Sequence, residues 1–407
     1  MTETIKLQPL WTTINPVPAA YLWLTEDLTA DVVVLGGGVL GALCALKLQE
    51  AGVETALLSG DPVGFGGAAV SSGTAQYEMP GGIARLAEKI GIDRAVRAFS
   101  LCREGIEALE ALIRELDCDC GCRRGDSLLY ASQETEVEKL RQEYLLRKHN
   151  GLPVEYLSGE RAKDLFSFEL SGGIVSKRMS VSLDPYRFTH AVLARAASKG
   201  ARIFENTGIR EVNCAADSQV LVANTGKKIH CGRLVLATES GAKNILPSLG
   251  GTRTAFAVAT EPVSVFAGWP GKCVVSSLSG TLHFSVTPDN RIVAMGLDSG
   301  MAGVRGRLAG IIPAEAFHEK KYAQLSAEIS RMFPGIRSAG ISAAFSCDYT
   351  VTPNGLPAVG RHRDYPGCVF SVCGGVSGLA FAPVAARHVV EMVLEKENPD
   401  HALFSLR

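Results

Sequence analysis

The chain has 407 residues, of which 46% are hydrophobic, so it can bury a sizeable core in two packed domains or in one large one. Its 41 basic and 42 acidic residues leave a formal net charge of -1. No overall field therefore attracts nucleic acid or an anionic membrane surface, and a small neutral or amphiphilic ligand fits better.

The first 30 residues lack the basic region and the long apolar region of a secretory signal. They contain Trp11, Tyr21 and Trp23, which predict an arm laid over the surface by its aromatic side chains. Gly, Pro or a charge interrupts every apolar stretch before it reaches the length of a membrane span. We therefore expect a cytoplasmic protein with no membrane span.

Residues 31–52 have the sequence DVVVLGGGVLGALCALKLQEAG, in which an apolar run leads into glycines and then into helical periodicity. This pattern predicts a buried strand, a tight turn and a helix. Gly36 permits the turn, Gly38 lets the backbone approach a pyrophosphate, and Gly41 lets the helix pack closely on the strand. Because a second strand follows at 54–58, the unit predicts a dinucleotide ligand. The alternative is a glycine-rich turn in an ordinary α/β protein.

A long loop of small residues follows the second strand, from Ser59 to Thr74. Small residues let backbone and hydroxyl groups surround a phosphate or a ring without steric interference. Because the loop begins where the dinucleotide would lie, we expect it to contact the ligand. The alternative is a flexible linker.

Helical periodicity at 83–115 and 134–150, with a strand-like stretch at 127–131, predicts a helical excursion from the sheet. Cys118, Cys120 and Cys122 place three thiols in five residues, a group able to hold a soft metal or to form a redox pair. No second CxxC pair or nearby histidine completes a four-ligand site. We therefore expect a turn with incidental cysteines and no metal site.

A helix start is well marked at Asp184, an N-cap residue followed by Pro185 in the first helical position, with Gly200 as the stop. Beyond it, an apolar strand at 233–238 is expected to return to the first sheet. Thr238, Glu239 and Gly241 would then lie at the ligand. An antiparallel ribbon is predicted from the short strands at 211–212, 219–222 and 228–230, and a further antiparallel sheet from the β-branched stretches at 255–267, 273–286 and 291–296.

A second glycine-rich turn lies near the C-terminus. It has the sequence CGGVSGL at 373–379, follows a strand at 368–372 and precedes a predicted helix at 383–396. That helix could direct its positive end at a developing negative charge.

Together these motifs resemble the flavin-dependent amine and amino-acid oxidases of the D-amino-acid oxidase, glycine oxidase and sarcosine oxidase superfamily. The resemblance covers nearly the whole chain. It rests on the first glycine unit, the small-residue loop, LDPY at 183–186, the strand LVLAT at 234–238 and TPNGLPAVG at 352–360. The aromatic arm is similar to the polyamine-type branch.

The resemblance implies an α/β fold with a Rossmann-type, glutathione-reductase-like FAD-binding domain that is discontinuous. This domain would take residues 1–78, 167–250 and 345–407. Residues 79–166 and 251–344 would form a substrate-binding domain of antiparallel sheet plus helices. The implied FAD contacts are Gly36, Gly38, Val39, Leu40, Gly41, Ser59, Gly66, Gly67, Ser71, Ser72, Gly73, Thr74, Val212, Thr238, Gly241, Cys347, Gly375, Val376, Ser377, Gly378 and Leu379.

Three positions depart from the family pattern. Ser59 stands where members usually have a glutamate that binds both ribose hydroxyls, although Asp61 lies close by in the sequence. Cys347 matches the cysteine that carries flavin covalently in the monomeric sarcosine oxidases; the alternative is that a small residue is needed there and cysteine serves. Ala380 replaces the lysine that binds a substrate carboxylate, which favours a larger amine or a substrate held by its other end.

The resemblance implies oxidation of a C–N bond in an amine or amino acid, with hydride transfer to flavin, an imine that hydrolyses, and oxygen or another electron acceptor. Tyr77, Glu78, His283 and Tyr349 are the candidates for facing the substrate. Two alternatives stay open, a nicotinamide-dependent dehydrogenase and a non-catalytic or partner-dependent flavoprotein subunit of a larger dehydrogenase.

Overall fold

The computed structural model describes residues 8–215, 218–264, 268–269, 274–300, 314–336 and 339–406. Parts of the predicted arm and of the stretches at 255–267 and 273–286 fall outside these residues, namely 1–7, 265–267 and 273. None of the described helices is both long enough and apolar enough to cross a membrane.

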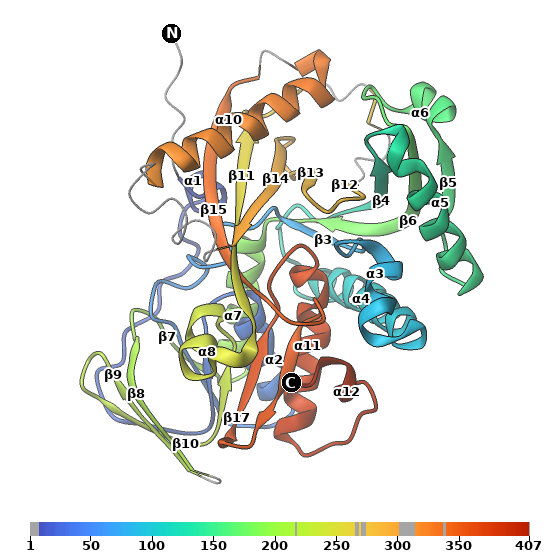
Figure 1. Cartoon of the computed structure of the whole chain (residues 1–407). Helices are drawn as coiled ribbons and strands as arrows, with labels where there is room; N and C mark the ends of the chain where they lie inside the picture. The colour runs from blue at the N-terminus through green and yellow to red at the C-terminus, as the bar shows by residue number, and fades with distance from the viewer. Residues whose placement is uncertain are drawn as a thin grey trace.

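Parallel strands form the centre of the first sheet. Its order is β16-β17-β10-β1-β2-β7, and β9 joins β10 and β8. The β1–β2, β1–β10, β10–β17 and β2–β7 pairs are parallel, so strands from the beginning, middle and end of the chain lie side by side (Figure 1). The strands are β1 (Leu28–Leu35), β2 (Thr55–Leu58), β7 (Arg202–Phe204), β8 (Ile209–Cys214), β9 (Gln219–Ala223), β10 (Lys228–Leu236), β16 (Ala358–His362) and β17 (Tyr365–Val372).

The predicted strand, turn and helix at residues 31–52 are confirmed as β1 and α2. The apolar side chains Val33 and Val34 of β1 are fully buried. Helix α2 is apolar on nearly all sides because it packs between the sheet and two other helices, α7 and α11. The predicted ribbon is also present, but its last strand continues into the apolar strand at 233–238, so that β10 is one strand of nine residues.

Four long helices pack into one apolar cluster with the sheet, namely α2, α4, α7 and α11. The N-cap prediction for α7 is confirmed, since the Asp184 carboxylate accepts hydrogen bonds from the backbone N–H groups of Tyr186 and Arg187. Helix α11 begins at Gly378, not at Pro383 as expected, because the N–H of Phe381 already bonds the carbonyl of Ser377. The helices are α1 (Leu10–Ile14), α2 (Val39–Glu50), α3 (Gly82–Ile90), α4 (Ile92–Glu115), α5 (Glu134–His149), α6 (Gly159–Leu165), α7 (Pro185–Ser198), α8 (Glu239–Ile245), α10 (Ala314–Met332), α11 (Gly378–Val393) and α12 (His401–Phe404), with 3-10 turns at Pro247–Leu249 and Pro334–Ile336.

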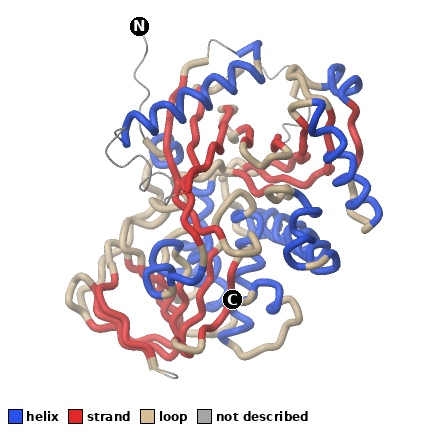
Figure 2. The backbone as a smooth tube through the Cα atoms, in the orientation of Figure 1, coloured by secondary structure: helices blue, strands red, loops and turns tan. Residues whose placement is uncertain are grey.

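A second, mixed sheet has the order β15-β11-β14-β13-β12-β4-β6-β3, with β5 beside β6. Helix α10 packs on β11 and β14, and the long strands β11 and β15 extend from this sheet toward α8 (Figures 1 and 2). The sheet membership differs from the sequence partition at β3, β6 and β15, because antiparallel pairing draws β3 and β6 to β4, and β15 to β11. The strands are β3 (Thr74–Gln76), β4 (Arg123–Ala131), β5 (Glu155–Ser158), β6 (Gly172–Ser182), β11 (Gly251–Thr260), β12 (Val274–Ser277), β13 (Leu282–Val286), β14 (Ile292–Gly300) and β15 (Ile341–Val351).

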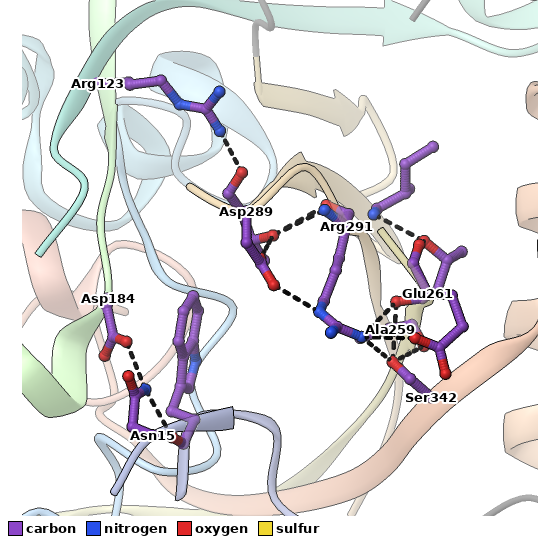
Figure 3. Close-up of polar contacts among 12 residues, drawn as sticks. Asn15, Arg123, Asp184, Ala259, Glu261, Asp289, Arg291 and Ser342 are labelled. Carbon is purple, nitrogen blue, oxygen red and sulfur yellow. Dashed lines mark hydrogen bonds and ion pairs between the residues drawn. The ribbon is translucent and has the colours of Figure 1, made fainter. Parts of the chain in front are cut away.

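The N-terminal arm is held by one aromatic residue and one amide. Trp11 is buried, and its Nε1 donates to the backbone oxygen of Ser71, 2.8 Å away. Asn15 donates to the Asp184 carboxylate at 2.6 Å and to the Trp11 carbonyl at 2.8 Å (Figure 3). Trp23, by contrast, is 59% exposed. The arm is therefore fixed to the small-residue loop and to the start of α7.

A buried arginine joins the end of β3 to helices α3 and α5. Arg147 is fully buried and donates to both oxygens of Glu78, at 3.1 and 2.7 Å, and to Glu143 at 2.7 Å. The two oxygens of Glu143 also accept the N–H groups of Ile83 and Ala84 in the first turn of α3. The guanidinium therefore compensates two carboxylates in a region without solvent.

We expect Arg147→Met to lower the free energy of unfolding by about 3–5 kcal/mol, because it leaves buried carboxylates without a counter-charge. Urea denaturation followed by circular dichroism measures the change. Arg331→Met is the matched control, since it removes an exposed ion pair with Glu328 and should cost less than about 1 kcal/mol. Equal losses in the two variants would contradict this role for the buried network.

Candidate active site

A cavity of about 1300 Å³ lies where the carboxyl ends of β1, β2 and β10 meet strands of the second sheet. Both glycine-rich turns line it, together with the small-residue loop and residues from β13, β14 and β15. Crevices at the carboxyl ends of parallel strands are the usual ligand sites of such sheets. The lining includes residues 35–40, 58–62, 66–68, 70–72, 207–210, 236–239, 243–245, 283–285, 295–296, 346–350 and 373–376.

The first glycine turn is shaped by close backbone contacts. Gly36 has a φ of +133°, and a Cβ there would lie 2.4 Å from the carbonyl oxygen of Ala237. A Cβ at Gly41 would lie 1.8 Å from the oxygen of Gly36. By contrast, nothing lies within 4 Å of a Cβ position at Gly38, where α2 begins without a side-chain cap. Since no side chain of the described residues caps the first N–H groups of α2, a phosphate could bind them.

Most of the cofactor-contacting residues expected from the sequence line this cavity, and three lie behind its surface. Gly41 packs under the turn, Gly73 lies against the Trp11 ring, and the Ser377 hydroxyl donates to the carbonyl of Glu78 at 3.2 Å. The lining members are Gly36, Gly38, Val39, Leu40, Ser59, Gly66, Gly67, Ser71, Ser72, Thr74, Val212, Thr238, Gly241, Cys347, Gly375, Val376, Gly378 and Leu379.

The end of β2 offers one small hydroxyl and one carboxylate. Ser59 is buried, and its Oγ would lie 2.5 Å from a Cβ at Gly37, so the serine packs directly under the glycine turn. Asp61 is exposed and lines the same cavity. Thr238, at the end of β10, has a buried Oγ1 for which the described residues provide no hydrogen-bond partner. The cavity therefore presents polar groups that a ligand could satisfy.

Two of the four candidates for facing the substrate, His283 and Tyr349, line the cavity from the second sheet. The Nδ1 atom of His283 lies 3.0 Å from Ser276 Oγ, whereas its Nε2 has no partner in the described part of the chain. Burial lowers the pKa of His283 to about 4, so the imidazole is neutral near pH 7. The Tyr349 hydroxyl donates to Asp298, and burial followed by the Asp298 charge raises the pKa of Tyr349.

Asp298 reaches the cavity from an irregular part of β14. The register of β14 against β11 shifts between Thr254 and Phe256, and Leu297 has a φ of +51°. Such bulges redirect side chains and occur often beside active sites. Burial raises the pKa of Asp298, although the hydrogen bond from Tyr349 acts in the opposite direction.

Glu239, the first residue of α8, connects β15 to the second glycine-rich turn. Its carboxylate accepts hydrogen bonds from the N–H of Thr350 at 2.9 Å and of Cys373 at 3.2 Å. Burial raises its pKa, and these backbone bonds oppose that shift. Asp348 also lines the cavity and accepts from the Thr254 hydroxyl at 2.6 Å. Of the three carboxyl groups of Asp298, Glu239 and Asp348, the sequence analysis predicted only Glu239 to lie at the ligand.

The family model of the DAO family, described as FAD dependent oxidoreductase, matches residues 31–392 of the chain. The chain belongs to this family. It is therefore an FAD-dependent oxidoreductase, and the family likeness and the Rossmann-type fold inferred from the motifs are confirmed. FAD, not a nicotinamide, is its cofactor.

Individual relatives of the DAO family are distant in sequence. The protein of Haemophilus influenzae named "Probable oxidoreductase OrdL" is 23% identical over 381 residues, covering 91% of this chain and 84% of that protein. Glycine oxidase of Bacillus licheniformis is 24% identical over 379 residues, covering 89% and 93%. The crystal structure of glycine oxidase from Geobacillus kaustophilus superposes with a TM-score of 0.73 at 20% identity, covering 94% of this chain and 99% of that one.

The residues present fit FAD. One continuous cavity joins the second glycine turn to the open backbone at Gly38 and to the exposed carboxylate of Asp61. It also contains Thr238 Oγ1, which has no hydrogen-bond partner in the described part of the chain. A dinucleotide with a phosphate-rich centre and a polar ring at each end matches such a set of groups.

Tyr77 and Glu78 do not line this cavity. The Tyr77 ring is buried edge-on against Phe99, with ring centroids 5.1 Å apart. The Glu78 carboxylate is taken up by Arg147. Both residues directly follow β3, which pairs with β6. Their side chains contact Phe99 of α4 and Arg147 of α5. Both side chains therefore belong to the buried region around Phe99 and Arg147, not to the surface of the cavity.

Cys347 lines the cavity, but its surroundings disfavour a thiolate. Burial, with added repulsion from Glu239, Asp348 and Asp298, raises the pKa of Cys347 to about 12. Formation of a thioether requires the thiolate as nucleophile. We therefore expect acid precipitation of the purified protein to leave the yellow colour in the supernatant. A coloured pellet that becomes colourless in Cys347→Ser would contradict this expectation.

We expect Asp61→Asn to weaken FAD binding by about tenfold or more, because hydrogen bonds to a charged group contribute about 1.5–3 kcal/mol. Fluorescence titration of the apoprotein with FAD measures the change. Asp119→Asn is the control, since Asp119 is exposed and pairs with Arg187 away from the cavity lining. Unchanged affinity in Asp61→Asn would rule out a ribose contact from this carboxylate.

Proposed function

We propose that this enzyme oxidises the C–N bond of an amine or amino acid, giving an imine that hydrolyses to a carbonyl compound and an amine. FAD, when bound, supplies the chemistry by accepting a hydride from the carbon next to nitrogen. The observation that carries the proposal is the continuity of one cavity, which joins both glycine turns to the polar side chains of β13, β14 and β15.

In this proposal, Gly38 and the first turn of α2 hold the pyrophosphate, and Asp61 takes the place of the missing ribose-binding glutamate. The second turn, at Gly375, and the start of α11 lie beside the flavin, where the positive end of the helix stabilises added negative charge. The dependence on FAD follows from the family, whereas these contacts rest on the lining of the cavity.

The substrate groups are assigned to the second sheet. His283 is neutral, and its Nε2 has no partner among the described residues, so it can accept or donate one hydrogen bond without adding charge. The Asp298 carboxylate, held by Tyr349, can pair with a substrate ammonium group. These groups orient the substrate and exclude water, and the reaction needs little further acid or base chemistry from the protein.

The charges of the lining favour an amine over a small amino acid. Three carboxylates of the lining, Glu239, Asp348 and Asp298, lie near Cys347. Of the two cationic side chains in the described lining, Lys243 bonds the Thr252 hydroxyl and Arg210 lies on β8, away from these carboxylates in the sequence. Ala380 is fully buried in α11, so it provides no carboxylate-binding group. We therefore expect the substrate to carry an amino group besides the one that reacts, and no carboxylate next to it.

Anaerobic mixing with a panel of diamines, N-methylated amines and amino acids tests this proposal through bleaching of the flavin absorbance. We expect diamines to bleach the flavin fastest. Asp298→Asn should lower kcat/KM for diamines by about 10- to 100-fold, which corresponds to the loss of a charge-assisted hydrogen bond.

Burial raises the pKa of Asp298, so its carboxylate is protonated at a higher pH than that of an exposed aspartate. As the pH is lowered, wild-type kcat/KM for diamines should therefore begin to fall at a higher pH than it would with an exposed aspartate at this position.

Asp289→Asn is the matched control, because Asp289 pairs with Arg291 and does not line the cavity. It should leave kcat/KM unchanged. If no member of the panel bleaches the flavin, the proposal that this protein oxidises amines is wrong. A flavoprotein subunit that acts only with a partner would then describe it better.

A further inference from the structure

A cluster of two histidines and one glutamate lies near the C-terminus, on residues that do not line the cavity. His388 and Glu391 are three residues apart on α11 and so share one face of the helix. His401 is the first residue of α12. The side-chain atoms of all three that can ligate a metal lie within 4.8 Å of one another.

His388 is an unusual part of this cluster because it is fully buried and yet unsatisfied. Neither of its ring nitrogens has a hydrogen-bond partner among the residues that the structure describes. Its Nδ1 lies 3.1 Å from Glu391 Oε2 without making a hydrogen bond. The ring packs against those of His401 and Phe404, with centroids 4.9 and 5.2 Å away. Burying a polar group without a partner is costly, so a ligand bound at a ring nitrogen of His388 would lower the free energy of this arrangement.

Two of the three spacings between the ligand atoms are close to those of metal ligands, and one of the two, from His401 Nε2 to Glu391 Oε2, is also a hydrogen bond. In a tetrahedral zinc site with bonds of about 2.0–2.1 Å, neighbouring ligand atoms lie about 3.3 Å apart. Here Glu391 Oε2 lies 3.1 Å from His388 Nδ1 and also 3.1 Å from His401 Nε2. Two histidines and one carboxylate are a frequent ligand set for zinc and other divalent transition metals.

The surroundings hold these groups in place and leave one position open. Asn398 donates to Glu391 Oε2 at 2.9 Å, as outer partners of metal-binding carboxylates do. Asp400 is held by Arg97 through two bonds of 2.9 and 2.6 Å, so it is not free to act as a fourth ligand. The side chains of Glu391 and His401 are each 20% exposed, which gives solvent and a metal ion access to the cluster.

We propose that His388, Glu391 and His401 bind one Zn²⁺ or a similar divalent transition-metal ion, with solvent in the remaining position. The ion would fasten α12 to α11. The segment after α12 lies against the first sheet, since a Cβ at Gly360 on β16 would be 3.0 Å from the Leu406 side chain. The site would therefore be a structural clamp for the C-terminal segment.

Calorimetric titration of chelator-treated, untagged, FAD-loaded protein with Zn²⁺ tests this proposal. We expect one equivalent of Zn²⁺ to bind, and to raise the melting temperature. His401→Gln and Glu391→Gln should each weaken binding by at least about 100-fold, since loss of an outer partner alone costs about 10- to 100-fold. In both variants Zn²⁺ should no longer shift the melting temperature.

His230→Gln is the control, because His230 is an exposed histidine on β10. It should bind Zn²⁺ as the wild type does. Circular dichroism shows that each variant is folded, and the two ligand variants change side chains that are partly exposed. Absence of stoichiometric binding by the wild type, or equal affinity in the wild type and both ligand variants, would overturn the proposal.

Discussion

The parallel alignment of β1, β10 and β17 is the constraint on which the site depends. Parallel strands end at the same edge of a sheet, so turns that are more than 300 residues apart in the sequence meet there. Backbone hydrogen bonds connect the strands at this edge. The N–H of Gly36 donates to the Leu58 carbonyl, and the N–H of Ala237 donates to the Leu35 carbonyl, both at 2.9 Å. The contact between Gly36 and Ala237 leaves no room for a side chain. Small changes at this edge would therefore displace both sides of the cofactor site.

The features that the sequence predicted correctly are those with local causes. The α2 unit follows from an apolar run, three glycines and helical periodicity, and α7 follows from one N-cap aspartate and one proline. The part of the lining at the ends of β1, β2 and β10 could be predicted because residues at the ends of parallel strands need no knowledge of register to be brought together. The sequence placed the start of α11 at Pro383, because a proline usually occupies the first turn of a helix. In the structure α11 begins at Gly378, so Pro383 lies in its second turn.

The substrate side of the cavity depends on long-range pairing that no local signal shows. Tyr349 lies opposite Arg253 through the register of β15 on β11, and Asp298 is exposed to the cavity by a bulge. Tyr77 and Glu78 adjoin a lining segment in the sequence, yet a buried arginine from α5 draws Glu78 into the core. The spacing of His388 and Glu391 on one helix was a readable signal of a shared face, but His401 joins them only through the packing of α12.

One set of charges links the chemistry of Cys347 to the choice of substrate. Burial, and then the charges of Glu239, Asp348 and Asp298, raise the pKa of the Cys347 thiol, so all of them oppose the thiolate that covalent attachment of flavin needs. The same carboxylates favour a bound ammonium group, which in turn offsets their mutual repulsion. If the site binds a cation, as we propose, it is poorly suited to form a thiolate, because a reactive thiolate needs positive charge nearby. The bonds from Thr350 and Cys373 to Glu239 stabilise its anionic form, which favours the cation-binding arrangement.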